Sequence, residues 1–152
     1  MMKSFLKKYQ FQFAGHIEVN GRRFVFRKSR NFPEEPVIYC WVLSKKAVSA
    51  KGEPIAIVYV GKASFGLPKR MSQHLSGFKN STTGIKNEKY VSSKLKSNHE
   101  LQVYVRKPLS YFVLGKSMNG CSIEEEFFIE LIENNTAHSD NGILNRKRYP
   151  KN

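Results

Sequence analysis

The chain has 152 residues, of which 40% are hydrophobic and 12% aromatic, and this composition is sufficient for one domain with a buried core. Its 26 Lys and Arg against 12 Asp and Glu give a net charge of +14, so nucleic acid is the first partner to expect. The sequence contains no bilayer-spanning apolar run, no signal-peptide pattern at its start and only two cysteines. We therefore expect a cytoplasmic protein that uses no membrane, no disulfide framework and no cysteine zinc site.

The first half of the chain predicts two β-hairpins. Residues 16–27 alternate apolar and polar side chains on both sides of Asn20-Gly21, which is a strong hairpin signal. A connector with two prolines follows, and the apolar runs 37–43 and 56–64 then predict a pair of buried strands joined by a polar, glycine-containing segment.

The second half predicts helices separated by extended segments. Leucine, methionine and phenylalanine recur at helical spacing, and this predicts a first helix. In chain order we expect a helix at 67–78, a helix at 88–98, a strand at 100–107, an extended piece of unclear pairing at 109–115 and a helix at 121–135.

The last predicted helix carries a carboxylate in an apolar setting. Counted from Glu124, apolar residues lie three, four, seven and eight positions further on, so Glu124 is centred on the apolar face while Glu125 and Glu126 turn towards water. A buried carboxylate costs several kcal/mol unless a cation or a metal ion compensates it. The alternative to a metal is an ion pair with one of the many arginines.

The order of these elements and residues resembles the GIY-YIG nuclease superfamily, and among its members it is most like the small phage endonucleases and the restriction enzymes. Valine replaces glycine in the first motif. The matching positions are Val37-Ile38-Tyr39, Tyr59-Val60-Gly61, Arg70, His74, Glu124 and Asn145. The resemblance implies an α/β (α+β) fold with a small, mainly antiparallel central sheet flanked by helices. An N-terminal β-hairpin and its connector (1–35) would extend the catalytic core (36–146), and a basic tail (147–152) would follow it.

The resemblance also implies roles for individual residues. Tyr39 would activate the attacking water and Tyr59 would orient that water or share the task. Arg70 would neutralise the scissile phosphate, His74 would bind the phosphate or a metal-bound water, and Glu124 would hold Mg²⁺, for which Mn²⁺ could substitute. A tyrosine with its ordinary pKa of about 10 is a poor base at neutral pH, so the chemistry requires cations beside the phenols. Taken singly, strand tyrosines also pack as ordinary β-formers.

Further basic and polar residues are candidates for DNA contacts. Gly61 would let the backbone approach a phosphate, and the others would contact phosphates or bases. The candidates are Gly61, Lys62, Arg22, Arg23, Lys86, Lys89 and Asn145.

We therefore expect a Mg²⁺-dependent endonuclease that hydrolyses double-stranded DNA, sequence-specific and of restriction or phage type. Because one active site must serve two strands, a homo-oligomer is plausible. A non-catalytic nucleic-acid-binding module and a structure-specific repair or recombination nuclease are the alternatives. The sequence leaves open which tyrosine is the base and whether Glu124 or Glu125 is the metal ligand.

Overall fold

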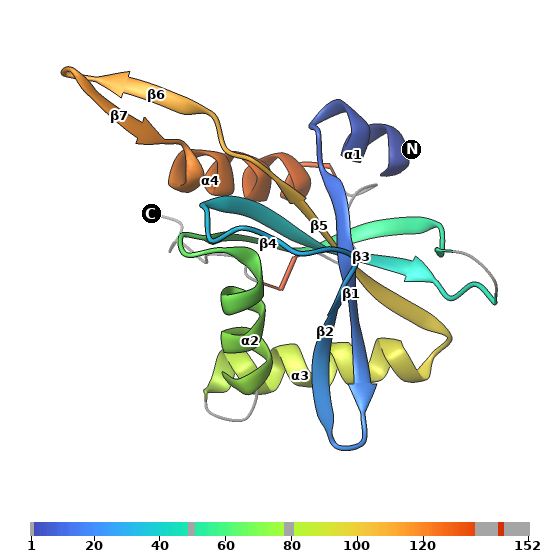
Figure 1. The fold of residues 1–152 in the computed structure, drawn as a ribbon. Coiled ribbons are helices and arrows are strands. Elements are labelled where there is room, and N and C mark those ends of the chain that lie inside the picture. The colour runs from blue at the N-terminus through green and yellow to red at the C-terminus, as the bar shows by residue number, and fades with distance from the viewer. Residues whose placement is uncertain (1, 49–50, 78–80, 136–142, 145–152) are drawn as a thin grey trace, which may run out of the picture.

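The computed structural model describes residues 2–48, 51–77, 81–135 and 143–144, which form helices on both sides of a β-sheet (Figure 1). The elements are α1 (Met2–Lys8), β1 (Gln12–Asn20), β2 (Arg23–Lys28), β3 (Val37–Lys45), β4 (Pro54–Ala63), α2 (Leu67–Gly77), α3 (Thr82–Lys96), β5 (His99–Arg106), β6 (Ser110–Val113), β7 (Lys116–Asn119) and α4 (Cys121–Glu133).

The central sheet has five strands in the order β2-β1-β5-β3-β4, and every pairing is antiparallel. The N-terminal hairpin extends this sheet because β1 pairs with β5. The predicted architecture, a small antiparallel sheet flanked by helices with an N-terminal hairpin extension, is confirmed. Strand β4 forms one edge of the sheet, so residues from the two faces can approach each other there.

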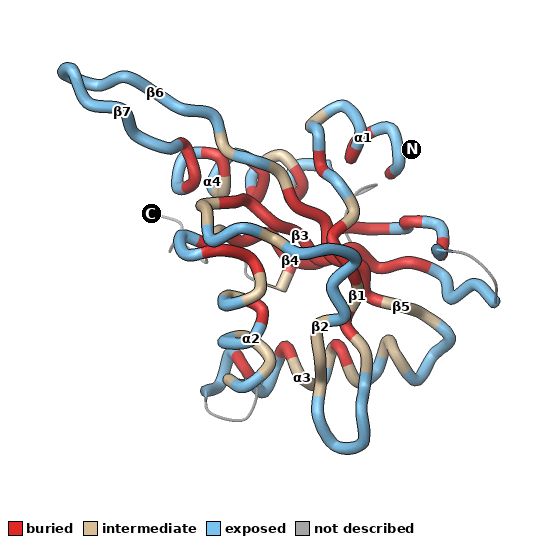
Figure 2. The backbone as a smooth tube through the Cα atoms, viewed as in Figure 1, coloured by how far each residue is buried: buried red, intermediate tan, exposed pale blue. Residues whose placement is uncertain are grey.

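Two cores lie on opposite faces of the sheet. Alternate residues of β3 point to opposite sides: Tyr39 and Trp41 join the core under α2 and α3, whereas Ile38 and Cys40 join the core under α1 and α4. All but the last residue of β3 are buried, and Figure 2 shows buried backbone running through the centre of the sheet. A strand covered on both faces reads as a continuous apolar run, which is how residues 37–43 read in the sequence.

Some elements differ from the predictions. Helix α3 begins at Thr82, before the predicted residue 88, because the Ser81 side chain caps it by accepting a hydrogen bond from the Gly84 amide at 2.9 Å. The helix α1 and the strand β7 were not expected. The turn of the first hairpin lies where Asn20-Gly21 predicted it, with Gly21 at φ +64°.

Within the described part of the chain, no helix is both long and apolar enough to cross a membrane. Cys40 and Cys121 are buried free thiols.

Candidate active site

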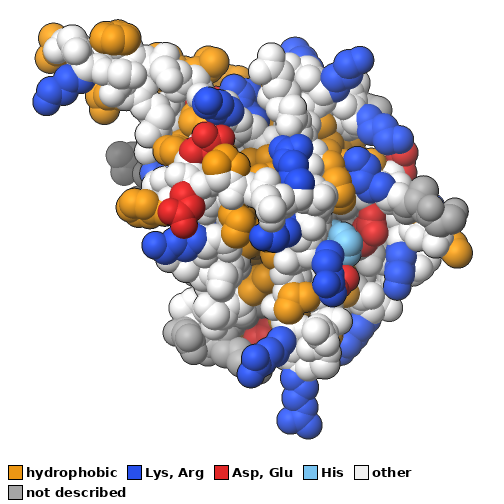
Figure 3. Space-filling model, in the orientation of Figure 1, with side chains coloured by type: hydrophobic (Ala, Val, Ile, Leu, Met, Phe, Trp, Pro, Cys, Tyr) orange, Lys and Arg blue, Asp and Glu red, His pale blue; other side chains and the backbone are white. Residues whose placement is uncertain are grey.

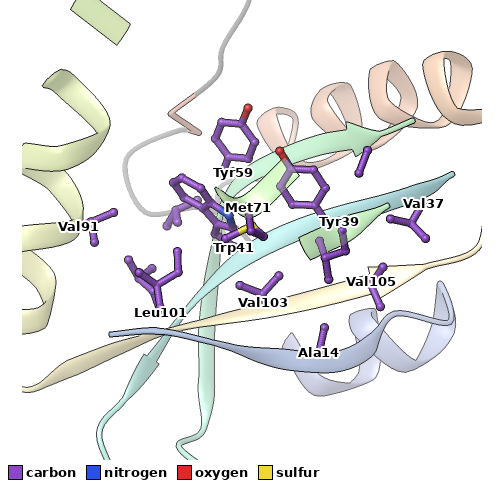
Figure 4. Close-up of a cluster of buried hydrophobic side chains, with 14 of the residues drawn as sticks. Ala14, Val37, Tyr39, Trp41, Tyr59, Met71, Val91, Leu101, Val103 and Val105 are labelled. Atoms are coloured by element: carbon purple, nitrogen blue, oxygen red, sulfur yellow. The ribbon is translucent and has the colours of Figure 1, made fainter. Parts of the chain in front are cut away.

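The two tyrosines of the predicted motifs lie side by side on one face of the sheet. The β3–β4 register sets Tyr39 opposite Gly61 and Trp41 opposite Tyr59. The two phenol rings stack with centroids 5.9 Å apart and planes 18° apart, and Trp41 stacks on Tyr59 at 4.6 Å. Figure 4 shows both phenols projecting from the face that also carries Trp41. Tyr39 is completely buried, whereas Tyr59 is 7% exposed and is the phenol nearer to solvent.

Gly61 makes room for this pair. A Cβ at position 61 would lie 2.6 Å from the Cζ and Oη atoms of Tyr39 and 2.9 Å from Cε1 of Tyr59. These distances are too short for real contacts, so a side chain there would displace the phenols. The glycine of the second motif therefore has a local reason to be present, in addition to its predicted role towards DNA.

Replacement of Gly61 by alanine is expected to destabilise the fold by about 1–3 kcal/mol, because overpacking must move a buried phenol. Urea unfolding followed by the fluorescence of Trp41, the single tryptophan, reports both the stability and the stacking on Tyr59. Gly77→Ala is the matched control, since among the described residues outside its own helix no atom lies within 4 Å of the added Cβ. An unchanged midpoint and spectrum for Gly61→Ala would show that the site tolerates a side chain there.

Helix α2 brings two further groups to the phenols. It packs on the sheet through Leu67 and Met71, and this places Arg70 and His74, one turn apart, on the flank beside the tyrosines. His74 Nε2 lies 2.5 Å from the Tyr39 hydroxyl, and its ring is edge-on to Tyr59 with centroids 5.0 Å apart. The structure thus brings together four of the predicted site residues: Tyr39, Tyr59, Arg70 and His74.

Burial controls the protonation of these groups. It raises the pKa of Tyr39 well above its ordinary value and Tyr59 raises it further, while Arg70 lowers it by less. Burial likewise raises the pKa of Tyr59. Burial, with a contribution from Arg70, lowers the pKa of His74 to about 4. At neutral pH both phenols are therefore protonated and the imidazole is neutral, so Nε2 can accept the hydrogen bond that the Tyr39 hydroxyl donates.

The lowered pKa of His74 predicts a pH-dependent stability. The imidazole of the unfolded chain takes up a proton at about pH 6.5, whereas that of the folded chain does so only at about pH 4. The contribution of His74 to the free energy of unfolding is therefore fully present above pH 6.5 and is lost as the pH falls towards 4. The loss from this group should be about 2–3 kcal/mol. We expect the difference in unfolding free energy between wild type and His74→Gln to shrink by that amount over this window in urea titrations. A difference independent of pH would contradict the buried neutral imidazole.

Glu124 is buried, as predicted, but it is compensated by an arginine. It is 6% exposed; its Oε1 lies 2.8 Å from Nη2 of Arg106, and its Oε2 accepts a hydrogen bond from the Leu109 amide at 2.8 Å. Arg106 also donates to the Tyr9 carbonyl at 2.9 Å. The ion pair, which was the alternative to a metal ion, is the arrangement that the structure shows for Glu124.

The neighbouring Glu125 lies near the end of the edge strand β4, where its charge acts on Tyr59. Its Oε2 is 3.8 Å from Nζ of Lys62, which also donates to the Ser122 hydroxyl at 2.7 Å. After burial, which is the main cause, the Glu125 carboxylate is one of the groups that raise the pKa of Tyr59, because its negative charge opposes ionisation of the phenol. The Glu125 side chain is 17% exposed, so solvent reaches it.

The choice of Glu124 over Glu125 as the metal ligand stays a prediction, and the two carboxylates have different surroundings: Glu124 pairs with Arg106, whereas the charge of Glu125 acts on Tyr59. The sequence placed Phe127 in the core, but it is 48% exposed. The buried residues of α4 are Cys121, Glu124, Phe128, Ile129 and Ile132. The buried face therefore includes Glu124 but not Phe127, because an almost continuous apolar run does not fix which of its residues meet the sheet.

The donor set fits a hydrated Mg²⁺. Among the residues that the structure describes, no three His, Cys, Asp or Glu side chains gather into a metal cluster. Mg²⁺ in proteins often uses one or two carboxylates and keeps several waters, so the single, partly exposed carboxylate of Glu125 fits this mode of binding.

Gly61 packs against the tyrosines and Lys62 follows it on β4, whereas four other candidate DNA contacts lie on other elements. Arg22 and Arg23 are exposed at the turn of the β1–β2 hairpin and line a groove of about 600 Å³ between β2 and α2. Lys86 and Lys89 are exposed on α3. Figure 3 shows Lys and Arg side chains spread over this face of the molecule. Asn145 lies outside the described residues.

No protein-family model and no curated protein sequence matches the chain. A solved structure of a mutant of bacteriophage T4 EndoII does match, with a TM-score of 0.61 and 22% identity over 86% of this chain and 93% of that chain. The chain has the GIY-YIG fold. The restriction endonuclease HPY188I in complex with product DNA is also similar, at a TM-score of 0.43 and 20% identity over 91% of this chain and 83% of that chain.

Two site residues were missed or left open by the sequence. Arg106 ends the strand β5 and faces the α4 side, as the alternation of that strand could have indicated, but nothing in the sequence paired it with Glu124. Glu125 was left open as the alternative to Glu124, and which of the two would hold a metal ion stays a prediction.

Proposed function

We propose that the chain is an endonuclease that hydrolyses phosphodiester bonds of double-stranded DNA with the help of a divalent metal ion. The observation that carries the proposal is the convergence of Tyr39, Tyr59, Arg70 and His74 on one face, with the Glu125 carboxylate at the adjoining sheet edge. The GIY-YIG fold and the net charge of +14 support it.

Arg70 and Lys62 supply the positive charge for the phosphate. The Arg70 guanidinium lies beside both phenols, and Lys62 extends from the end of β4. A guanidinium placed where negative charge builds up on the phosphorane stabilises the transition state more than the ground state. We assign Arg70 to the scissile phosphate and Lys62 to a neighbouring one.

The two phenols and the imidazole form a route for the proton of the attacking water. Tyr59 is the phenol nearer to solvent, its ring stacks on that of Tyr39 with centroids 5.9 Å apart, and Tyr39 contacts His74. A proton taken from water by the Tyr59 oxygen passes to Tyr39 and then to His74, so no phenolate has to persist. Arg70 contributes to the low pKa of His74, so a phosphate bound to Arg70 raises that pKa and makes His74 a better acceptor when substrate is present.

Glu125 is the residue that would hold the metal ion. When bound there, Mg²⁺ or Mn²⁺ supplies positive charge that stabilises the leaving 3′ oxygen. Glu124 is engaged by Arg106 and the Leu109 amide, so we give it a structural role.

The β1–β2 hairpin is proposed to read the DNA sequence. It is a two-stranded ribbon with arginines at its turn, and such a ribbon can enter the major groove. The exposed lysines of α3 would add salt-dependent phosphate contacts.

Supercoiled plasmid tests the proposed function. With Mg²⁺ or Mn²⁺ we expect nicked and then linear DNA, with 5′-phosphate and 3′-hydroxyl ends that recur at defined sites, and no cleavage in EDTA. Binding without cleavage in either metal would overturn the nuclease and favour a non-catalytic binding module. Faster cleavage of branched than of linear DNA would instead assign a structure-specific nuclease.

A further inference from the structure

The turn between β4 and α2 carries an exposed aromatic side chain that the candidate active site does not use. Phe65 is 73% exposed, whereas Gly66 and Leu67, which follow it, are buried. In the chain it lies after Lys62 and before Arg70, the two residues that we assign to phosphates. The ring therefore belongs to the same short segment as the cations of the candidate site.

The backbone of this turn is fixed on two sides. Gly66 has φ +96°, and a Cβ at this position would lie 3.1 Å from Cα of Glu34 and 3.2 Å from the Pro33 carbonyl oxygen. The connector between β2 and β3 thus packs closely against Gly66. On its other side, the Gly66 carbonyl accepts a hydrogen bond from the Arg70 amide at 3.3 Å, at the start of α2. The turn therefore presents the ring of Phe65 to solvent in a defined position.

A cation lies against the ring. Nζ of Lys69 is 5.2 Å from the centroid of Phe65, and Lys69 directly precedes Arg70 on α2. In a nucleic acid each phosphate lies within one nucleotide of a base. A phosphate that binds Lys69 or Arg70 therefore brings its adjoining bases towards Phe65.

The ring stands alone and is not part of an apolar patch in this segment. Among the described residues 56–77, Phe65 is the only exposed large hydrophobic residue, and Ile55 lies near the opposite end of β4. Single exposed hydrophobic residues are common, and one ring is too small for the core of a protein interface. One ring does match the face of one base, and aromatic rings beside cations are typical of surfaces that stack on bases.

We propose that Phe65 inserts as a wedge between two base pairs of duplex DNA, at the step beside the phosphate that Arg70 binds. The bases of a duplex already stack on one another, so the ring reaches the face of a base only by opening a step. Lys62, Lys69 and Arg70 would bind backbone phosphates around that step and so offset the cost of unstacking. The position beside the scissile phosphate rests on the proposed function, whereas insertion itself requires only DNA binding.

The wedge would give a sequence preference without a hydrogen bond to any base. Pyrimidine–purine steps, which are TA and CA/TG, unstack more easily than other steps. We therefore expect the sequenced cleavage sites of wild type to be enriched in these steps within about two base pairs of the cut. The cleavage sites of Phe65→Ala should lose that enrichment.

Relaxation of a plasmid in EDTA by a topoisomerase that needs no metal ion tests the insertion itself. A side chain that opens base steps unwinds the helix, so wild-type protein should shift the linking number of the relaxed plasmid in proportion to the amount bound. Phe65→Ala should leave the linking number unchanged, although its affinity stays within about tenfold of wild type because phosphate contacts dominate binding. Phe65→Trp should unwind the plasmid as wild type does, with quenching of the introduced indole by the bases. Unchanged circular dichroism verifies that both variants are folded.

Ile55→Ala is the matched control, because it also removes an exposed hydrophobic side chain from the β4 region, and it should unwind DNA as wild type does. A wild-type protein that leaves the linking number unchanged, or a Phe65→Ala protein that unwinds as strongly as wild type, would overturn the wedge. The assay contains no divalent ion, so its result does not depend on cleavage. Unwinding by a protein that cuts nothing in Mg²⁺ therefore contradicts only the proposed function, and cleavage without unwinding contradicts only the wedge.

Discussion

Replacement of Glu125 by glutamine is expected to slow DNA cleavage by at least about 1,000-fold, a loss of about 4 kcal/mol of transition-state stabilisation. Glutamine has the shape of glutamate but lacks the charge that would hold a divalent ion. The Glu125 side chain is partly exposed, and its cationic neighbour Lys62, at 3.8 Å, is also exposed to solvent. Removing the charge of Glu125 therefore leaves no buried charge unpaired, and we expect the variant to fold. Single-turnover cleavage of a labelled duplex at saturating Mg²⁺ measures the effect.

Two variants on the same helix are the controls. Glu126→Gln alters the next, exposed position and should cleave within about threefold of wild type. Glu124→Gln should also retain cleavage at temperatures where it is folded. If Glu125→Gln cleaved DNA within about tenfold of the wild-type rate while Glu124→Gln was folded but inactive, Glu124 would be the metal ligand.

The second large effect concerns stability. Glu124→Gln should lower the free energy of unfolding by about 3 kcal/mol, because it leaves the Arg106 guanidinium buried without its counter-ion. It also removes the charged acceptor of the Leu109 amide at the base of the β6–β7 hairpin. Urea unfolding monitored by circular dichroism measures this change in the free energy of unfolding.

An exposed ion pair provides the comparison. Lys3 and Glu53 form a salt bridge in which both side chains are 64% exposed, so Glu53→Gln should cost less than about 1 kcal/mol. Replacing Glu124 and Arg106 together by leucine should recover part of the loss, since no unpaired charge remains. A Glu124→Gln protein as stable as wild type would show that the ion pair does not support the fold.

Much of the fold could be predicted because the local signals agree with the tertiary structure. The apolar runs around Tyr39 and Tyr59 form the paired strands β3 and β4, and the period that predicted a helix from Leu67 places Arg70 and His74 together. Helix α1 and strand β7 were missed because they are short, and β7 is stabilised mainly by its pairing with β6.

The sequence could not determine which glutamate of α4 lies at the candidate site. Three consecutive glutamates precede a nearly continuous apolar run, and a shift of one residue rotates a helix by about 100°. Only contacts with the sheet decide that Phe128 is buried and that Glu124 meets Arg106.

The protonation of the phenols also required the structure. Cations beside Tyr39 and Tyr59 were expected to make a phenolate accessible, and Arg70 does lower both pKa values, but burial outweighs it. The sequence shows which charges are available, whereas the balance between charge and desolvation depends on depth in the fold. Burial keeps the imidazole of His74 neutral, and a neutral imidazole is what its proposed role as proton acceptor requires.

Tyrosine-sensitised terbium luminescence tests the central claim, that a metal ion bound at Glu125 lies beside the phenols. Tb³⁺ substitutes for oxygen-bound divalent ions and emits when excited through a nearby phenol. We expect emission from wild type and from folded Glu124→Gln, displacement by Mg²⁺, a marked decrease in Tyr59→Phe and loss in Glu125→Gln. Emission that persists in Glu125→Gln, or that is lost in folded Glu124→Gln, would contradict the site.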